Sequence, residues 1–198
     1  MENIRKADIC RKTKETDIKL QLEILQNGAC GSFKGTSGIG FFDHMLCAFA
    51  THGGFNITLE AKGDLEVDCH HTIEDIGIVL GQAFCTALKD KCGIARFADL
   101  YIPMDEALCF CAVDVSGRPF VVFDAQFSAD MIGQYDTQMT KEFFRALAFN
   151  AGFTLHLKAL YGENDHHITE AMYKACARAL SKACAVCGND IMSSKGTL

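Results

Sequence analysis

The stretch CHHTIEDIGIVLGQAF, residues 69–84, places two adjacent histidines and a glutamate at the start of a predicted helix. The stretch DHHITEAMYKACARAL, residues 165–180, repeats this HHxxE pattern at the start of another predicted helix. Adjacent residues on a helix point about 100° apart, whereas residues three or four positions apart share a face. One ion cannot easily reach both histidines of a pair, so the doubled histidine indicates a site with two metals.

The segments before the two motifs also match each other, which indicates an internal duplication. HMLCAFATHGGFNITL, beginning at His44, aligns with EFFRALAFNAGFTLHL, beginning at Glu142. After a two-residue deletion, the histidines and glutamate of the first motif fall on those of the second. We therefore predict two half-repeats, residues 1–92 and 93–198, that together form one compact catalytic domain.

Local patterns predict an alternation of strands and helices. Hydrophobic periodicity and glycine stop signals predict helices over 41–54, 71–91, 136–152 and 166–186. Alternating segments predict strands over 14–25, 55–61 and 153–160, two or three more within 94–125, and a glycine-rich loop over 28–40. Helices and strands that each have one apolar face favour an α+β fold in which helices pack on sheets.

Composition limits the class of protein and its partners. The chain has 198 residues, of which 49% are hydrophobic and 22% charged, typical of a globular protein. Its net charge of −6 argues against nucleic-acid binding, although a few arginines and lysines suffice for a small phosphorylated substrate. No apolar run is long enough for a membrane span, and the N-terminal segment has no signal-like apolar core. We therefore expect a cytoplasmic protein without a membrane partner.

Eleven cysteines raise the question of disulfides or zinc. No CxxC pair occurs, and the number is odd. Cys109 and Cys111 alternate along a predicted strand, and Cys85 and Cys176 lie on apolar faces of predicted helices. This pattern favours reduced, mostly buried thiols.

The duplication predicts two metal sites with similar ligands, because each motif can give a His/Glu pair to one ion and a lone histidine to the other. On the i, i+3 spacing, His71 would share an ion with Glu74. One predicted ligand set is His44, His71, Glu74 and His166, and the other is His70, Glu142, His167 and Glu170. Mixed imidazole and carboxylate ligands suit Mn, Fe, Co, Ni or Zn.

For the other polar residues, the sequence alone permits two interpretations. Arg96 and Arg118, at predicted strand edges, fit either a phosphate clamp or ordinary surface charge. Lys195 in SSKG is typical of a polar tail, and Glu15 before a strand carries little signal by itself.

Together, the motifs resemble the imidazoleglycerol-phosphate dehydratase family of histidine biosynthesis. The resemblance rests on GIGFFDHML, HHTIEDIGIVLGQA, SGRP, FFRALAFNAGFTLH, GENDHHITEA and SSKG, which occur in the family's order. It extends over nearly the whole chain, from RKTKET to SSKG.

The resemblance implies a fold, an assembly and a cofactor. The fold would be an internally duplicated β-α unit with helices sandwiched between two four-stranded sheets, as in the ribosomal protein S5 domain 2-like fold. The implied homo-oligomer is a 24-subunit shell built through trimers, with active sites between subunits and two Mn²⁺ ions per subunit. The family's ligands match the eight positions above, except that Glu142 stands where many members carry histidine. A carboxylate also suits Mn²⁺.

The resemblance also implies substrate contacts and a reaction. The metal ligands would also contact the substrate, together with Glu15, His52, Arg96, Arg118, Lys174, Ser193, Ser194 and Lys195. The reaction removes water from imidazole glycerol phosphate and gives imidazole acetol phosphate. We hypothesise that a dimetal-bound imidazolate expels the C3 hydroxyl to form a diazafulvene-like intermediate, which then loses the C2 proton. Glu170 is the expected base, and His52, Asp105 and Glu15 are expected to manage the hydroxyl groups and protons.

Two other classes use comparable residues. A binuclear hydrolase would keep the arginines for phosphate and use water as its nucleophile. A ferritin-like metal-storage shell would carry Glu-x-x-His on an all-helical bundle, whereas this sequence has the reverse order and strands between its helices.

Overall fold

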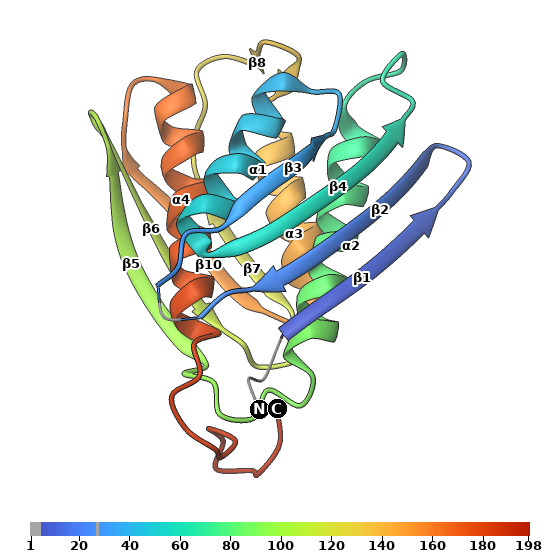
Figure 1. Ribbon diagram of the computed structural model, residues 1–198. Helices are drawn as coiled ribbons and strands as arrows, with labels where there is room; N and C mark the ends of the chain where they lie inside the picture. The colour runs from blue at the N-terminus through green and yellow to red at the C-terminus, as the bar shows by residue number, and fades with distance from the viewer. Residues whose placement is uncertain (1–4, 27) are drawn as a thin grey trace.

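The computed structural model describes residues 5–26 and 28–198, which form two four-stranded sheets with four helices between them (Figure 1). The first sheet has the strand order β1-β2-β4-β3. Its strands are β1 (Arg5–Lys12), β2 (Thr16–Ile24), β3 (Ser32–Thr36) and β4 (Phe55–Gly63). Neighbouring strands are antiparallel except that β3 runs parallel to β4.

The second sheet repeats this topology with the order β5-β6-β10-β7. Its strands are β5 (Phe97–Met104), β6 (Ala107–Asp114), β7 (Phe120–Asp124) and β10 (Thr154–Tyr161). Here β7 runs parallel to β10, as β3 does to β4. A small hairpin of β8 (Met131–Ile132) and β9 (Tyr135–Asp136) is inserted before the third helix.

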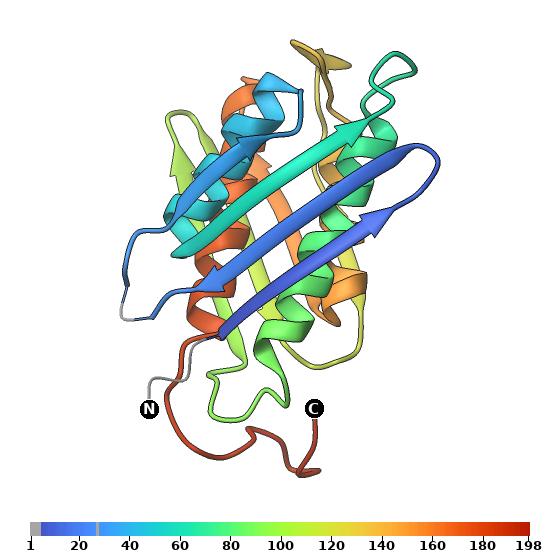
Figure 2. The ribbon, with the colours of Figure 1, turned by 45° about the vertical axis from the view of Figure 1, so that its right-hand side comes forward.

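The helices form the middle of the sandwich (Figures 1 and 2). They are α1 (Gly40–Gly53), α2 (His70–Leu88), α3 (Met139–Ala151) and α4 (Asp165–Ala183). Helix α2 packs on the first sheet and α4 on the second, while α1 packs beside α4 and α3 beside α2. A Cβ at Gly81 of α2 would lie 2.5 Å from the Leu147 carbonyl oxygen, so glycine permits the close approach of α2 and α3.

The chain therefore repeats the order β-β-β-α-β-α, and matched glycines end the first helix of each half. Gly54 has φ 68° and Gly152 has φ 72°, the left-handed conformation that glycine adopts most easily. Their backbone N–H groups donate to the carbonyl oxygens of Ala50 and Ala148, four residues earlier. The α+β sandwich predicted from the sequence is confirmed.

The core lies between the sheets and around the helices. Alternate side chains of β2 and β6 point inward, and aromatic rings fill the space where the helices meet. Phe143 stacks on Tyr173 at 5.1 Å between ring centroids and meets the edge of Phe42 at 5.3 Å. Phe42, which belongs to this cluster, lies two residues before His44 on α1. The cluster therefore supports the region around that histidine.

The structure corrects three details of the predicted secondary structure. Strand β1 falls in an N-terminal segment that was assigned no element, β3 lies inside the predicted loop 28–40, and the β8–β9 hairpin was not expected. Both β1 and β3 are edge strands with mainly exposed or half-buried side chains. Such strands lack the strong apolar alternation by which central strands are recognised.

The cysteines are all free thiols, as expected, but the prediction that most are buried is wrong. Cys69, Cys109, Cys111, Cys176 and Cys184 are buried, whereas Cys10, Cys30, Cys47, Cys85 and Cys187 are exposed. Cys85 follows the buried Phe84 on α2 and lies on the outer face of that helix, not on its apolar face.

The arrangement also separates the remaining fold classes. The helices are divided between two sheets, so the ferritin-like helical bundle does not apply. Within residues 5–26 and 28–198, the structure contains no helix with both the length and the apolar character needed to span a bilayer.

Candidate metal centre

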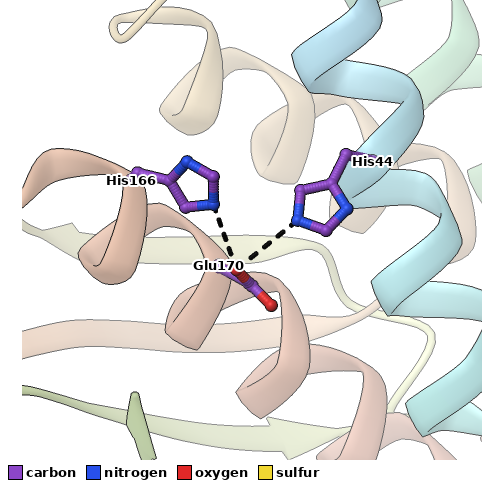
Figure 3. A group of neighbouring side chains, drawn as sticks. All are labelled: His44, His166 and Glu170. Atoms are coloured by element: carbon purple, nitrogen blue, oxygen red, sulfur yellow. Dashed lines mark hydrogen bonds and ion pairs between the residues drawn. The ribbon is translucent and has the colours of Figure 1, made fainter. Parts of the chain in front are cut away.

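Three predicted ligands converge between α1 and α4 (Figure 3). His44 Nε2 lies 3.5 Å and His166 Nε2 lies 3.2 Å from the same Glu170 oxygen, Oε2. One ligand atom of each residue lies within 4.8 Å of the other two. The Phe41 ring meets the His166 ring at 4.9 Å in an edge contact, which restrains the imidazole. Two imidazoles and a carboxylate at this spacing can hold a divalent transition-metal ion.

Lys174 completes the charge balance of this cluster. Its Nζ lies 2.6 Å from Glu170 Oε1, one helical turn further along α4. Burial tends to raise the pKa of Glu170, but Lys174, His44 and His166 outweigh it and hold that pKa below its ordinary value. The carboxylate is therefore ionised at neutral pH. His52, in the last turn of α1, has a lowered pKa because it is partly buried and because Lys174 and Arg178 are nearby.

The motif on α2 is more open. His70 Nε2 lies 3.8 Å from Glu74 Oε2, and the two side chains are 48% and 39% exposed. Glu142, in the first turn of α3, forms an ion pair with Arg145 at 3.1 Å. His70 and Glu142 line one hollow of about 450 Å³. His70 and Glu142, which the sequence assigns to one ligand set, thus face the same hollow.

Both motifs pair their histidine and glutamate at i, i+4, namely His70 with Glu74 and His166 with Glu170. The sequence favoured i, i+3 pairs, such as His71 with Glu74. Helix geometry permits both spacings. In each motif, the first histidine contacts the motif glutamate, and the second histidine turns to a different carboxylate.

These two carboxylates were not predicted from the sequence. His71 Nδ1 lies 2.9 Å from Asp64 Oδ2, and His167 Nδ1 lies 2.7 Å from Glu106 Oε2. Each contact raises the pKa of its histidine. The His167 contact, together with hydrogen bonds from backbone N–H groups, lowers the pKa of Glu106 to about 2. Asp64 and Glu106 lie in turns outside both motifs, and no local pattern in the sequence points to them.

The other nitrogen of each of these histidines faces a residue expected to handle protons. His71 Nε2 lies 4.0 Å from Glu15 Oε2, in the turn between β1 and β2. His167 Nε2 lies 3.6 Å from Asp105 Oδ2, in the equivalent turn between β5 and β6. The two halves therefore place an acidic turn residue in the same relation to the second histidine.

Each helix start is fixed by a side chain just before the histidines. Asp68 accepts a hydrogen bond from the His70 backbone N–H at 2.7 Å, and Asn164 accepts one from that of His166 at 2.9 Å. Asp165 is buried and accepts hydrogen bonds from Ser128 and Ala129, which ties the loop before β8 to the start of α4.

Two of the predicted substrate-binding residues, Arg96 and Arg118, lie with the C-terminal tail at the other end of the second half, whereas Lys174 lies beside Glu170. Arg96 forms a two-pronged contact with Asp114, at 2.8 and 3.2 Å, and donates to the Met192 carbonyl oxygen at 2.6 Å. Arg118 lies 3.9 Å from Asp114 and is 66% exposed. The C-terminal tail, which carries Ser193, Ser194 and Lys195, thus packs beside Arg96, while the backbone of Gly93 bonds to Cys187 and Asp190.

In one chain, helices α1 and α3 lie between α2 and α4, so the two motifs do not meet (Figure 1). Among the described residues, His44, His166 and Glu170 are the one group of three or more potential ligands within mutual reach. The predicted sets mix residues of both motifs. Neither set is assembled within a single chain.

The comparisons with known proteins agree in sequence and in fold. A sequence profile of the family described as imidazoleglycerol-phosphate dehydratase matches residues 37–180. The chain is 54% identical over 196 residues to the imidazoleglycerol-phosphate dehydratase of Caldicellulosiruptor saccharolyticus, covering 99% of this chain and 100% of the relative. It is 50% identical over 198 residues to that of Methylorubrum extorquens, covering 98% and 100%.

Solved structures of that enzyme have the same fold. The Staphylococcus aureus structure superposes with a TM-score of 0.81 at 38% identity, covering 91% of this chain and 99% of that one. The Pyrococcus furiosus structure gives 0.81 at 37% identity, covering 96% and 100%. The chain therefore belongs to the imidazoleglycerol-phosphate dehydratase family, a family of hydro-lyases in histidine biosynthesis.

Proposed function

We propose that the chain carries out its family's dehydration of imidazole glycerol phosphate in a metal-dependent manner. The observation that carries the proposal is the convergence of His44, His166 and Glu170 at positions marked by the duplicated motif. An ionised carboxylate and two imidazoles form a ligand group, and the paired lysine keeps this group balanced in charge. A purely structural ion pair does not need two histidines on one carboxylate oxygen.

We propose two Mn²⁺ ions per subunit, with Glu142 among the ligands of one of them. The donor set fits, because Mn²⁺ accepts both imidazole and carboxylate ligands. When bound, two such ions would favour the imidazolate form of the substrate ring, which can expel a neighbouring hydroxyl group. His71 and His167 are oriented for ligation through Nε2, since their Nδ1 atoms face Asp64 and Glu106.

We propose that each active site is completed by another copy of the chain. Each predicted ligand set draws on both motifs, whereas one chain keeps α2 and α4 on either side of α1 and α3. Two half-exposed motifs on one subunit can be joined by the opposite motifs of its neighbours. This supports a homo-oligomer with interfacial active sites, and the 24-subunit shell of the family is the assembly we expect.

Phosphate recognition is proposed for Arg118, Arg96, Lys174 and the Ser193–Lys195 tail. Arg118 is open to solvent, because its side chain is 66% exposed and its guanidinium lies 3.9 Å from Asp114. Arg96 uses its planar fork on Asp114 and holds the tail through the Met192 carbonyl. A phosphate that displaces Asp114 would give both arginines a doubly charged partner.

Proton transfer is proposed for the acidic groups around the two motifs. Glu170 is ionised and can accept the C2 proton of the substrate. His52 has a pKa below its ordinary value and is neutral at pH 7, so it can accept or pass on a proton. Glu15 and Asp105 lie beside the Nε2 atoms of His71 and His167, where they can bond substrate hydroxyl groups.

The test is reconstitution of the dehydration with metal. The assembled protein is stripped with a chelator, given imidazole glycerol phosphate, and assayed for imidazole acetol phosphate with and without Mn²⁺. Product that appears only with Mn²⁺ supports the proposal. Full activity in protein shown to be free of metal would overturn its metal dependence.

The same assay separates dehydration from metal-dependent hydrolysis. A binuclear hydrolase acting on this substrate would release inorganic phosphate. The dehydratase retains the phosphate on the carbon chain and forms a ketone. Free phosphate without ketone would replace the proposed reaction with hydrolysis.

A further inference from the structure

The second histidine of each motif is held by a carboxylate that lies outside the motif. Asp64 Oδ2 lies 2.9 Å from His71 Nδ1, and Glu106 Oε2 lies 2.7 Å from His167 Nδ1. In contrast, His70 and His166 face the glutamate of their own motif through Nε2. The two histidines of each pair therefore have different partners through different ring nitrogens.

The two halves reach the same contact by different routes. Asp64 directly follows β4, whereas Glu106 lies in the turn between β5 and β6. The strand equivalent to β4 is β10, and the residue that follows it is Gly162, which has no carboxylate. The contact is therefore not a simple copy carried along by the duplication. Both halves place a carboxylate on Nδ1, although the chain supplies it from unrelated turns.

Glu106 is fixed in place by the segment that leads into α4. Its Oε1 accepts hydrogen bonds from the backbone N–H groups of Glu163, at 3.1 Å, and Asn164, at 2.8 Å. Its Oε2 is thereby directed at His167. The Asp64 side chain is 18% exposed, and its Oδ1 is buried without a hydrogen-bond partner among the described residues. Backbone hydrogen bonds therefore fix Glu106, whereas the side-chain contact of Asp64 is with His71.

An ionised carboxylate can only accept a hydrogen bond, so a histidine facing it through Nδ1 carries its proton on that atom. In the neutral ring, the lone pair then lies on Nε2. The Nε2 atoms of His71 and His167 point toward Glu15 and Asp105, at 4.0 and 3.6 Å. Each ring is thus presented with its free nitrogen on the side where the proposed metal and substrate are expected.

We propose that Asp64 and Glu106 are positioning residues that fix the Nδ1–H tautomer of His71 and His167 and turn Nε2 toward the metal. The proposal rests on the proposed metal-binding function of these two histidines. Outer carboxylates of this kind orient ligating histidines and raise their basicity. They do not themselves touch the metal or the substrate.

The first experiment needs no substitution and no metal. Magic-angle-spinning NMR of the assembled protein, labelled with ¹⁵N-histidine and stripped of metal, distinguishes protonated from unprotonated ring nitrogens at a pH where the rings are neutral. We expect two histidines in the Nδ1–H form, and we expect Asp64→Asn and Glu106→Gln each to change one of them. If neither ring is in the Nδ1–H form, the proposal is overturned.

The variants work because an amide can replace the carboxylate almost without a change of shape. In Glu106→Gln, the amide oxygen can keep the bonds from Glu163 and Asn164, so the NH₂ group faces His167 Nδ1 and donates to it. The proton then moves to Nε2 and blocks ligation. Glu163→Gln and Glu66→Gln are matched controls, because both side chains are exposed. Glu66 lies two residues from Asp64, and Glu163 lies beside Glu106, to which its backbone N–H donates.

The second readout is Mn²⁺ affinity, measured from the free-ion signal in electron paramagnetic resonance. Loss of an outer carboxylate should weaken binding at one of the two sites on the order of 10- to 100-fold, with the controls unchanged. Wild-type affinity in both variants would overturn the positioning role. If the unmodified protein binds no Mn²⁺, the proposed metal dependence fails, while the tautomer measurement still decides whether the carboxylates fix the rings.

Discussion

The HHxxE motif at the start of α2 and the one at the start of α4 have the same letters but different neighbours in space. At α4, His44 comes from α1 and joins His166 on Glu170, whose side chain is only 9% exposed. At α2, the residue aligned with His44 is Glu142 of α3, and the motif glutamate Glu74 is 39% exposed. We call the α4 group the closed cluster because its glutamate is buried, although His44 and His166 are 50% and 42% exposed, and the α2 motif the open motif.

The charges around the two motif glutamates also differ. Lys174 lies one turn after Glu170 and forms an ion pair with it, whereas the residue in the same position after Glu74 is Ile78. Beside the α2 motif, Glu142 of the second half stands in place of an imidazole and adds a second carboxylate, which pairs with Arg145. The comparison teaches that the two copies of the HHxxE motif kept the same residues while the charges around them changed.

The largest expected effect comes from removing the carboxylate of the closed cluster. Glu170→Gln, assayed at saturating Mn²⁺, should lower kcat by about 100-fold or more, because the proposed base can no longer accept a proton. Glu74→Gln should act mainly on Mn²⁺ affinity, so that excess metal restores most of its activity. Full activity of Glu170→Gln with its metal content retained would contradict the proposed asymmetry.

A second prediction concerns the contacts that hold the β1–β2 hairpin on α2, which the second half lacks. In the first half, buried Asp75 of α2 binds Arg11 Nε at 3.0 Å and the Thr16 hydroxyl; the aligned residue in α4 is Ala171. Asp75→Ala should lower the free energy of unfolding by roughly 2–4 kcal/mol, because Arg11 loses its buried partner.

Chemical denaturation measures this loss. Lys12→Ala is the control, since its ion pair with Asp17 is exposed and should contribute less than about 1 kcal/mol. Equal losses of unfolding free energy in the two variants would contradict the prediction that the buried contact of Asp75 with Arg11 contributes more than the exposed ion pair of Lys12.

The matched glycines provide a smaller and more direct comparison. Alanine in the left-handed conformation costs about 1–2 kcal/mol, so both Gly54→Ala and Gly152→Ala should be destabilising. A Cβ at Gly54 would lie 2.7 Å from the Ala29 carbonyl oxygen, whereas one at Gly152 would lie 3.2 Å from Gly117 Cα. Gly54→Ala should therefore cost more. The order of the two unfolding midpoints checks this, and the reverse order would contradict it.

The smallest effect is expected from a substitution that gives the aligned positions 44 and 142 the same residue. Glu142→His gives the second half the residue type that the first half has at His44, and should shift metal preference from Mn²⁺ toward Zn²⁺ or Co²⁺, on the order of tenfold or less. Competition between these ions in the stripped, assembled protein measures the shift. An unchanged preference would indicate that Glu142 does not bind the metal.

Strong local signals predicted a layered α+β architecture and its central elements, whereas the arrangement of helices between two four-stranded sheets was implied by the family resemblance. The apolar stripes of α2 and α4 and the alternation of β2 and β6 follow from burial on one face or on both. Edge strands β1 and β3 have weaker patterns, because one side of each lacks a partner strand and most of their side chains meet solvent.

For the site, the doubled histidines and the duplication identified His44, His166 and Glu170 as potential ligands, and the structure brings these three together. The direct contacts in the structure are at i, i+4, whereas the sharing of one ion by His71 and Glu74 stays a prediction. Asp64 and Glu106 could not be predicted, since they lie 7 and 61 residues from their histidines in turns without any metal-binding pattern.

The sequence by itself determined which side chains are available and on which helix face each one lies, because these properties depend on spacing along a regular backbone. Only the tertiary structure decided which of them meet. Packing of α1 against α4 and of α3 against α2 gave one half a histidine and the other a glutamate. Turns outside the two motifs, 7 and 61 residues away, then supplied carboxylates to the second histidines, a result that depends on how the chain folds back on itself.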